Sequence, residues 1–394
     1  MRVISVVIWL LTLVGLPKEL NAQPGLSVHF PQQAETTMRL SAYTGLDLVF
    51  VDSIRGDETG LFRYDSILPL GMYVLDSGQF SMEFLSVGNP LECFVDGLDD
   101  TLDIRFVDSP ENTLWRAYLA LREKHQYGRK NPETFWRLTD SLMEGVRDYA
   151  TALILVDRDS VLHESDFADA SLIPTNVLTT KIVYFLEQSD TAFVPATDQL
   201  LKMAKVNMES YEFVLQYLLK GFTALGLSEV TDHLLNFPQI GEGEITEEEG
   251  MRLERLTEPY QKVRVGVKAP DFQVVSIDGK SYHLYESSAP HVIVFFWAVD
   301  CEYCHEFLTN IRKNLDLENE YELVTFAIAD SEKEVRRELK KLKLKGVHCY
   351  DAARWEGRTF LDYHVMSTPT AFVLDGDKTI VAKPYDWGEM RVEN

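Results

Sequence analysis

The chain has 394 residues, 45% of them hydrophobic, and a formal net charge of −24. This length allows two or three domains, and the share of apolar residues is enough to build their cores, which excludes an intrinsically disordered protein. The strong negative charge repels phosphate backbones and anionic lipid, so the sequence argues against a nucleic-acid-binding protein.

The first 22 residues have the pattern of an export signal. Arg2 precedes a mostly apolar stretch over residues 3–16, and Pro17 separates that stretch from a small residue, Ala22. An apolar stretch of this length is too short to span a bilayer comfortably. We therefore predict a signal peptide over residues 1–22 and a periplasmic protein, soluble or loosely associated with the membrane. An uncleaved membrane anchor is the alternative.

Residues 23–108 are predicted to form an antiparallel β-sandwich domain. Short alternating apolar stretches separated by turn residues are typical of strands. The predicted strands cover residues 38–43, 46–51, 71–75, 80–85 and 102–107. Cys93 lies in a further stretch of this kind, and we interpret it as a small buried apolar residue.

Residues 109–239 are predicted to form a helical domain, because apolar residues there recur at helical spacing. The predicted helices cover residues 113–126, 133–150, 176–188 and 199–225. A glycine- and glutamate-rich stretch over residues 240–250 follows, with a short helix behind it, and we predict a linker over residues 240–262.

The residues that could take part in a chemical reaction lie mainly in the predicted third domain, residues 263–394. An apolar run over residues 292–297 predicts a strand buried on both faces, and residues 302–319 predict a helix. Cys301 therefore lies at a strand-to-helix junction, where free N–H groups and the helix dipole stabilise a thiolate. Cys304 lies one turn further along and can attack a mixed disulfide at Cys301. We predict that these two cysteines are catalytic.

Four segments resemble the TlpA/ResA-type family of thioredoxin-like thiol–disulfide oxidoreductases. They are GVKAPDF at residues 266–272, FWAVDCEYC at 296–304, YD at 350–351 and YHVMSTPTAFVLD at 363–375. The resemblance implies an α/β thioredoxin fold over residues 263–394 and a protein-disulfide oxidoreductase without a cofactor or metal. More weakly, the preceding regions resemble the β-sandwich and helical extensions found in exported proteins of Bacteroidetes-type bacteria.

The resemblance also implies which residues surround the cysteine pair. Pro369, preceded by Thr368, is expected to be a cis proline beside Cys301 that guides an extended substrate chain. Trp297 is expected to pack beside the substrate site, and Glu302 and Tyr303 are expected to tune the redox potential. The expected partners are disulfide-containing exported proteins and a membrane-linked thiol donor, and a homodimer through the N-terminal domains is a further expectation. The sequence leaves the direction of the reaction, reducing or oxidising, open.

The sequence departs from the family at three places. Phe295 occupies the position at which many thioredoxins keep a buried acid, and Phe307 occupies one at which TlpA/ResA-type proteins often carry a glutamate. Glu306 is one position away from the latter, so we assign no general base. The family's closing helix is nearly absent after Tyr385, and we expect that edge of the sheet to be less covered, or covered by another domain.

Two alternative enzyme classes fit parts of the same motif. Residues 301–305 spell CEYCH, which is also a haem c attachment pattern, but we interpret His305 as an exposed helix residue. A peroxiredoxin would require a threonine three residues before its reactive cysteine, and Ala298 occupies that position.

Two further alternatives concern binding. Cys301 and Cys304 together with His348 and Cys349 offer thiolates and an imidazole for zinc or copper, although we favour Cys349 as a buried strand residue. A non-catalytic exported adaptor could also use the thioredoxin fold as a scaffold, and the two intact cysteines argue against this.

Overall fold

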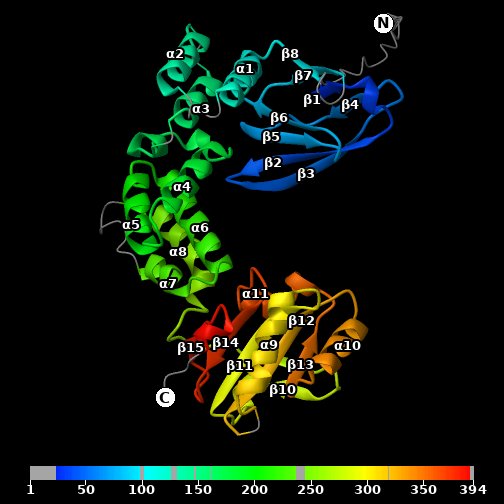
Figure 1. Cartoon of the computed structure of the whole chain (residues 1–394), viewed down its shortest axis with the longest axis vertical. Coiled ribbons are helices and arrows are strands. Elements are labelled where there is room, and N and C mark those ends of the chain that lie inside the picture. The colour runs from blue at the N-terminus through cyan, green and yellow to red at the C-terminus, as the bar shows by residue number, and fades with distance from the viewer. Residues whose placement is uncertain are drawn as a thin grey trace, which may run out of the picture. The chain divides into compact units, whose positions relative to one another are not determined.

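The computed structural model describes residues 24–97, 102–125, 131–145, 148–159, 161–236, 245–317 and 319–390. They divide into two compact units at Arg158 and Asp159, with Pro174–Asn176 belonging to the first unit (Figure 1). The predicted signal at residues 1–22 lies outside the described residues. None of the described helices is both long enough and apolar enough to cross a membrane.

The first unit contains a sandwich of two four-stranded sheets, ordered β4-β1-β7-β8 and β3-β2-β5-β6. The strands are β1 (Leu26–His29), β2 (Thr37–Thr44), β3 (Asp47–Arg55), β4 (Leu61–Tyr64), β5 (Gly71–Asp76), β6 (Ser81–Ser86), β7 (Leu91–Asp96) and β8 (Asp103–Val107). All the paired strands are antiparallel except β1 and β7, which pair in parallel. The sandwich expected from the alternating pattern is therefore present, with Cys93 fully buried in its core.

In its described residues, the first unit also contains the α-helices α1 (Pro110–Lys124), α2 (Pro132–Leu142) and α3 (Tyr149–Asp157). The buried amide of Asn112 joins α1 to β6, because it accepts a hydrogen bond from the Leu85 N–H at 2.7 Å and donates one to the Leu85 carbonyl at 2.8 Å. The prediction of a single helix over residues 133–150 is wrong. Gly145 has a positive φ of 81°, and the Asp148 side chain accepts a hydrogen bond from the Thr151 N–H, which starts a new helix there.

The second unit begins with two short 3₁₀ helices, Glu164–Phe167 and Ala170–Leu172. They are followed by helices α4 (Val177–Glu187), α5 (Phe193–Ala204), α6 (Met208–Ala224), α7 (Ser228–Asn236) and α8 (Glu247–Gln261). The helix predicted over residues 199–225 is two helices, because Asn207 caps α6 by accepting a hydrogen bond from the Ser210 N–H. Helix α8 lies within the predicted linker and starts with a capping box of Thr246 and Glu249. The helices expected in one domain are thus divided between the two units.

The rest of the second unit is a five-stranded sheet ordered β13-β12-β11-β14-β15, with a two-stranded hairpin beside it. Its elements are β9 (Gln273–Val275), β10 (Ser281–His283), β11 (His291–Ala298), α9 (Glu302–Asn314), β12 (Tyr321–Ile328), α10 (Glu332–Leu342), β13 (Val347–Tyr350), α11 (Arg358–Asp362), β14 (Thr370–Leu374) and β15 (Ile380–Ala382). The central strand β11 runs parallel to β12 and antiparallel to β14. This is the thioredoxin-like α/β fold that the sequence predicts.

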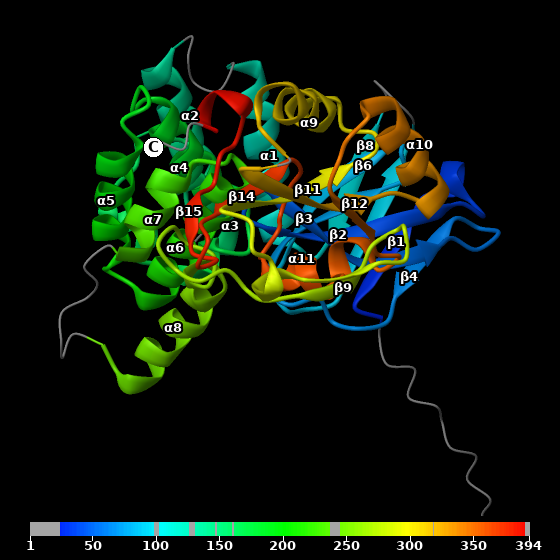
Figure 2. The same ribbon diagram turned by 90° about the horizontal axis from the view of Figure 1, so that it is seen from below.

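Alternate residues of β11 face two different cores. Ile293, Phe295 and Trp297 pack with residues of α9 and α10, whereas Val294 and Phe296 pack with residues of α11. The view along the sheet shows α9 on one face and α11 on the other (Figure 2). The segment after β15 forms a short 3₁₀ helix, Trp387–Glu389, and the partly buried Trp387 packs against the core on the α9 face. The edge strand β15 is covered by the backbone of residues 266–269, because the Gly266 N–H donates a hydrogen bond to the Ile380 carbonyl. The helical region also covers this end of the sheet, since Gly226 lies against the Tyr385 ring, so the expected cover by another domain is present in part.

Candidate active site

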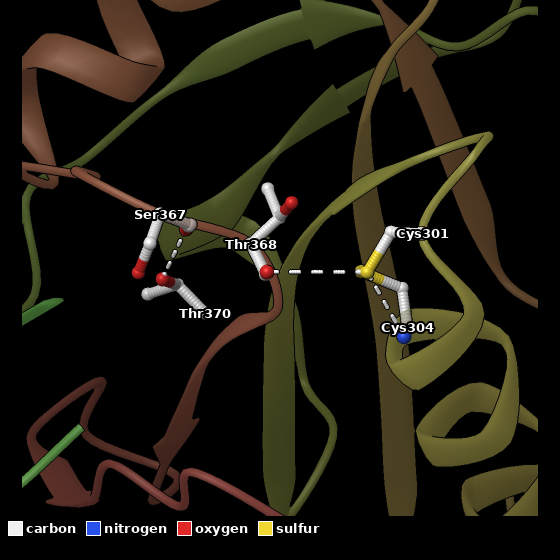
Figure 3. Close-up of a disulfide and its surroundings, with 5 residues drawn as sticks. All are labelled: Cys301, Cys304, Ser367, Thr368 and Thr370. Atoms are coloured by element: carbon white, nitrogen blue, oxygen red, sulfur yellow. Dashed lines mark hydrogen bonds between the residues drawn. A yellow bond between two sulfur atoms is a disulfide. The ribbon is translucent and has the colours of Figure 1, made fainter. Parts of the chain in front are cut away.

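The two predicted catalytic cysteines lie at the start of α9, directly after β11. Cys301 is the N-cap residue of the helix, and its Sγ accepts a hydrogen bond from the Cys304 N–H at 3.1 Å. The two side chains form a disulfide, with 5.2 Å between their Cα atoms (Figure 3). The structure therefore brings together the pair that the two-residue spacer predicts. It also directs an N–H group of the helix at the first sulfur.

The two cysteines differ in exposure. Cys301 is partly exposed, whereas Cys304 is fully buried. A disulfide of another protein can approach Cys301 but not Cys304. The geometry thus favours Cys301 as the attacking residue and Cys304 as the residue that resolves the mixed disulfide.

The loop that precedes β14 forms the wall opposite Cys301. The bond between Thr368 and Pro369 is cis, as the resemblance implies. The carbonyl oxygen of Thr368 lies 3.9 Å from Cys301 Sγ. The hydroxyl of Thr370 donates a hydrogen bond to the Ser367 carbonyl at 2.7 Å and so closes the loop (Figure 3). Backbone groups of Thr368 and Pro369 are therefore held beside the sulfur that is open to a substrate.

The two positions at which the sequence departs from the family are in contact. The rings of Phe295 in β11 and Phe307 in α9 meet edge to face, with 5.1 Å between their centroids. Both belong to the apolar core that contains Cys304. An acidic side chain at one position would face an aromatic ring at the other. The two replacements therefore form one apolar layer beneath the cysteine pair, consistent with our assigning no general base there.

The structure corrects two expectations near this layer. His305 is not an exposed residue: its Nε2 is buried, and its ring lies against Trp297 with 5.8 Å between the centroids. Trp297 is fully buried, so it supports the cysteines from inside the domain and does not line a substrate surface. Within the described residues, neither His305 Nε2 nor Trp297 Nε1 has a hydrogen-bond partner. The sequence could not show this, because the side of α9 that faces β11 depends on helix packing.

Glu302 and Tyr303 lie in the first turn of α9 and are exposed to solvent, Tyr303 to 79%. Their position next to the pair agrees with a role in substrate contact or in tuning the potential, which remains a prediction.

Sequence reasoning missed a groove that begins beside Thr368 and Pro369. It has a volume of about 650 Å³, and part of its wall comes from the segment after β15. We call it the Tyr303–Trp387 groove. It is lined by Tyr303, Glu306, Phe307, Asn310, Thr368, Pro369, Tyr385, Asp386, Trp387 and Gly388. No local motif marks residues 385–388, so only the fold could place them beside the cysteine pair.

The remaining cysteines are structural. Cys93 and Cys349 are both buried free thiols, and burial raises the pKa of each to about 12. Cys349 packs in the core on the α11 face of the sheet, whereas Cys304 packs on the α9 face. The metal site considered from the sequence is therefore not assembled. In the described part of the chain, no group of three or more histidine, cysteine or acidic side chains is arranged to hold a metal ion.

Comparisons with known proteins agree with this geometry. Residues 265–383 match the model of the AhpC/TSA family. The thioredoxin-like protein YneN of Bacillus subtilis is 30% identical over 131 residues, which are 30% of this chain and 73% of YneN. The thiol-disulfide oxidoreductase ResA of Bacillus cereus is 25% identical over 126 residues, which are 31% of this chain and 70% of ResA.

The chain belongs to the thioredoxin-like thiol–disulfide oxidoreductases. Among solved structures, a thioredoxin-like protein from Bacteroides caccae is similar over 61% of this chain and 90% of its own, at 19% identity and a TM-score of 0.41. The family match confirms the resemblance read from the four sequence segments. It also identifies the protein as a thioredoxin-like protein-disulfide oxidoreductase.

Proposed function

We propose that this oxidoreductase is exported and reduces disulfides in periplasmic proteins through Cys301 and Cys304. The observation that carries the proposal is the pairing of a partly exposed Cys301, capped by the Cys304 N–H at the start of α9, with a fully buried Cys304. Such a helix start stabilises a thiolate and supplies a nucleophile, while the second thiol is kept for the internal step.

The reaction proceeds by two thiol–disulfide exchanges. The Cys301 thiolate attacks one sulfur of a client disulfide, which forms a mixed disulfide and releases the first client cysteine as a thiolate. The Cys304 thiolate then attacks Cys301 Sγ, which closes the Cys301–Cys304 disulfide and releases the second client cysteine. The released thiolates take up protons from solvent, and the client gains the two electrons that the protein loses. A membrane-linked thiol donor then reduces the closed pair.

Thr368 and Pro369 position the client during the first exchange. Their backbone lies beside Cys301 and offers the Thr368 carbonyl to a chain that passes over the exposed sulfur. A client disulfide is thereby held in an extended segment next to the attacking atom, which lowers the entropic cost of the encounter. Glu302 and Tyr303, exposed at the same helix start, meet the flanking residues of the client.

An insulin-reduction assay tests the proposal directly. With dithiothreitol as the final donor, we expect the full chain to accelerate insulin reduction and Cys301→Ser to remove the acceleration completely. A folded parent protein without activity would favour the adaptor. Consumption of hydrogen peroxide in place of insulin reduction would favour a peroxidase.

Export rests on residues 1–22 and needs its own test. Fusion of these residues to a reporter enzyme that is active only outside the cytoplasm should give activity, and replacement of the apolar stretch over residues 3–16 by polar residues should abolish it. Equal activity of the two fusions would contradict export by this segment.

A further inference from the structure

The Tyr303–Trp387 groove joins two segments that are far apart in sequence. One wall is the first three turns of α9, with Tyr303, Glu306 and Asn310, and the other is the segment after β15, with Tyr385 and Trp387. The walls meet at Thr368 and Pro369, which also flank Cys301. A polypeptide chain that crosses Cys301 therefore has the groove as its continuation.

The wall that follows β15 is held in place by several contacts. The Tyr385 N–H donates a hydrogen bond to Glu389 Oε2 at 3.0 Å, and Asp386 Oδ1 accepts one from the Gly388 N–H at 2.6 Å. The Tyr385 ring packs directly on Gly226, where an added Cβ would lie 2.1 Å from Tyr385 Cδ2. The wall is thus fixed before any client arrives, and a fixed groove binds with less entropic cost than a mobile one.

Helix α6 also contacts the loop that contains Pro369. The Ser367 hydroxyl donates a hydrogen bond to the Ala224 carbonyl, at the C-terminal end of α6, at 3.3 Å. Gly226 follows this end with a φ of 70°, the left-handed conformation that a glycine adopts readily. The helical part of the second unit therefore supports both the Pro369 loop and the Tyr385 wall.

The charges of the groove have one sign. Its charged lining residues are Glu306 and Asp386, and its lining contains neither lysine nor arginine. Among the described residues, neither carboxylate forms an ion pair within 4.0 Å of a basic side chain. Glu302, exposed one turn before Glu306, adds a further carboxylate at the same helix start. The groove is therefore complementary to a cation.

The apolar surface of the groove is aromatic. Tyr303 is exposed to 79% and Tyr385 to 47%, and Trp387 contributes a third ring. Aromatic faces attract the cationic groups of lysine and arginine as well as apolar side chains. Exposed aromatic residues with adjacent acids are thus suited to an extended segment that carries both kinds of side chain.

We propose that the Tyr303–Trp387 groove selects clients in which lysine or arginine, together with an apolar residue, flanks the cysteine that Cys301 attacks. The inference rests on the proposed function and names the class of substrate for the same site. The cationic side chain lies between Glu306 and Asp386, and the apolar residue lies on Tyr303 and Tyr385.

The test uses the reduced full chain and disulfide-linked dimers of two short peptides. In one peptide lysines flank a Phe-Cys core, and in the other glutamines replace the lysines. Each rate of reduction is divided by the rate of the same peptide with dithiothreitol, which removes the effect of lysine on the thiol itself. We expect the lysine peptide to react about three- to tenfold faster, since one or two exposed ion pairs each contribute up to about 1 kcal/mol.

Matched variants locate the origin of this preference. The double variant Glu306→Gln and Asp386→Asn should lose it. The double variant Glu320→Gln and Asp377→Asn should keep it. The latter changes the net charge equally, but Glu320 and Asp377 lie near the opposite end of the sheet, where β11 begins. High salt should also reduce the preference of the parent protein, a readout that needs no variant.

Two outcomes overturn the inference, and a third overturns the proposed function. Equal rates for the two peptides would show that the groove does not select cations. Equal loss of the preference in both double variants would assign it to the net charge of the chain and not to the groove. If the parent also failed to reduce a small neutral disulfide, bis(2-hydroxyethyl) disulfide, the proposed function itself would be wrong. Reduction of that compound without a peptide preference would overturn the inference alone.

Discussion

Cys301 and Cys349 are less than fifty residues apart in the same domain, yet their surroundings give opposite chemistry. Cys301 caps a helix, is partly exposed and accepts an N–H hydrogen bond. Cys349 lies in the interior of β13, where burial raises its thiol pKa to about 12. The difference shows that the position in the fold, and not the residue type, creates a reactive thiol. A helix start stabilises the thiolate, and an apolar core suppresses it.

The largest expected effect is on the turnover rate, and it tests the difference between the reactive and the buried cysteine positions. In Cys304→Ala, each attack by Cys301 should end in a mixed disulfide that no second thiol resolves, so multiple-turnover insulin reduction should fall by about 10²-fold or more. Cys349→Ala should keep the parent's rate, because that thiol is not part of the exchange. Mass spectrometry should detect the trapped client on Cys304→Ala. A comparable loss of activity in Cys349→Ala would contradict the division between the two cysteine positions.

A second effect separates a buried position of α9 from the exposed position one turn before it. Phe307→Glu would place a carboxylate against Phe295 in the core, and we expect it to lower the free energy of unfolding by about 3 kcal/mol or more. Tyr303→Glu, four residues earlier at the exposed start of the helix, should change it by less than about 0.5 kcal/mol. Urea unfolding of the two variants measures the difference. If Phe307→Glu were as stable as Tyr303→Glu, a carboxylate would be tolerated beneath the pair and the apolar layer would not exist.

A third and smaller effect concerns His348, the neighbour of Cys349 in β13. Its Nδ1 lies 2.9 Å from the Thr325 hydroxyl, and burial lowers its pKa below the usual value. The His348 imidazole therefore binds a proton near pH 6.5 in the unfolded chain, but only at a lower pH in the folded domain. Stability is retained above that pH and declines as the pH falls below it, by at most about 1.4 kcal/mol per pH unit for one histidine.

Urea unfolding of the parent at pH 7.5 and 5.5 measures this decline, and His348→Gln should make it smaller. Burial also lowers the pKa of His364, so a part of the decline should remain in the variant. If stability declined as much in His348→Gln as in the parent, protonation of His348 would not destabilise the folded domain. That result would contradict the conclusion that β13 lies in a buried, apolar interior.

The sequence predicted the thioredoxin domain better than the helices before it. A continuous apolar run such as residues 292–297 specifies a buried central strand, and the segments on either side fix the position of Cys301. The helices of residues 133–150 and 199–225 were predicted as continuous because apolar spacing persists across their breaks. The breaks depend on Asp148 and Asn207, whose side chains cap the next helix. These capping residues mark the helix starts in the sequence, but the continuous apolar spacing across the breaks led to the prediction of one helix in each case.

The candidate site was predictable only in part, for the same physical reason. Cys301, Cys304 and the Thr368–Pro369 bond follow from short motifs, because their chemistry depends on neighbours in sequence. The orientation of His305 toward Trp297 and the approach of Tyr385 to Gly226 depend on how separate elements pack. Such contacts join residues far apart in the chain, and no periodicity records them.

The most direct test of the central claim is the alkylation rate of Cys301 in the reduced full chain. Limiting iodoacetamide at a series of pH values, followed by peptide mass spectrometry, reports the reactive fraction of each cysteine. The account predicts that Cys301 reacts first, with a pH midpoint below the value of about 8.5 for a free thiol, while Cys304 and Cys349 stay protected. Alkylation of Cys301 no faster than that of a free thiol, or preferential alkylation of Cys304, would contradict it.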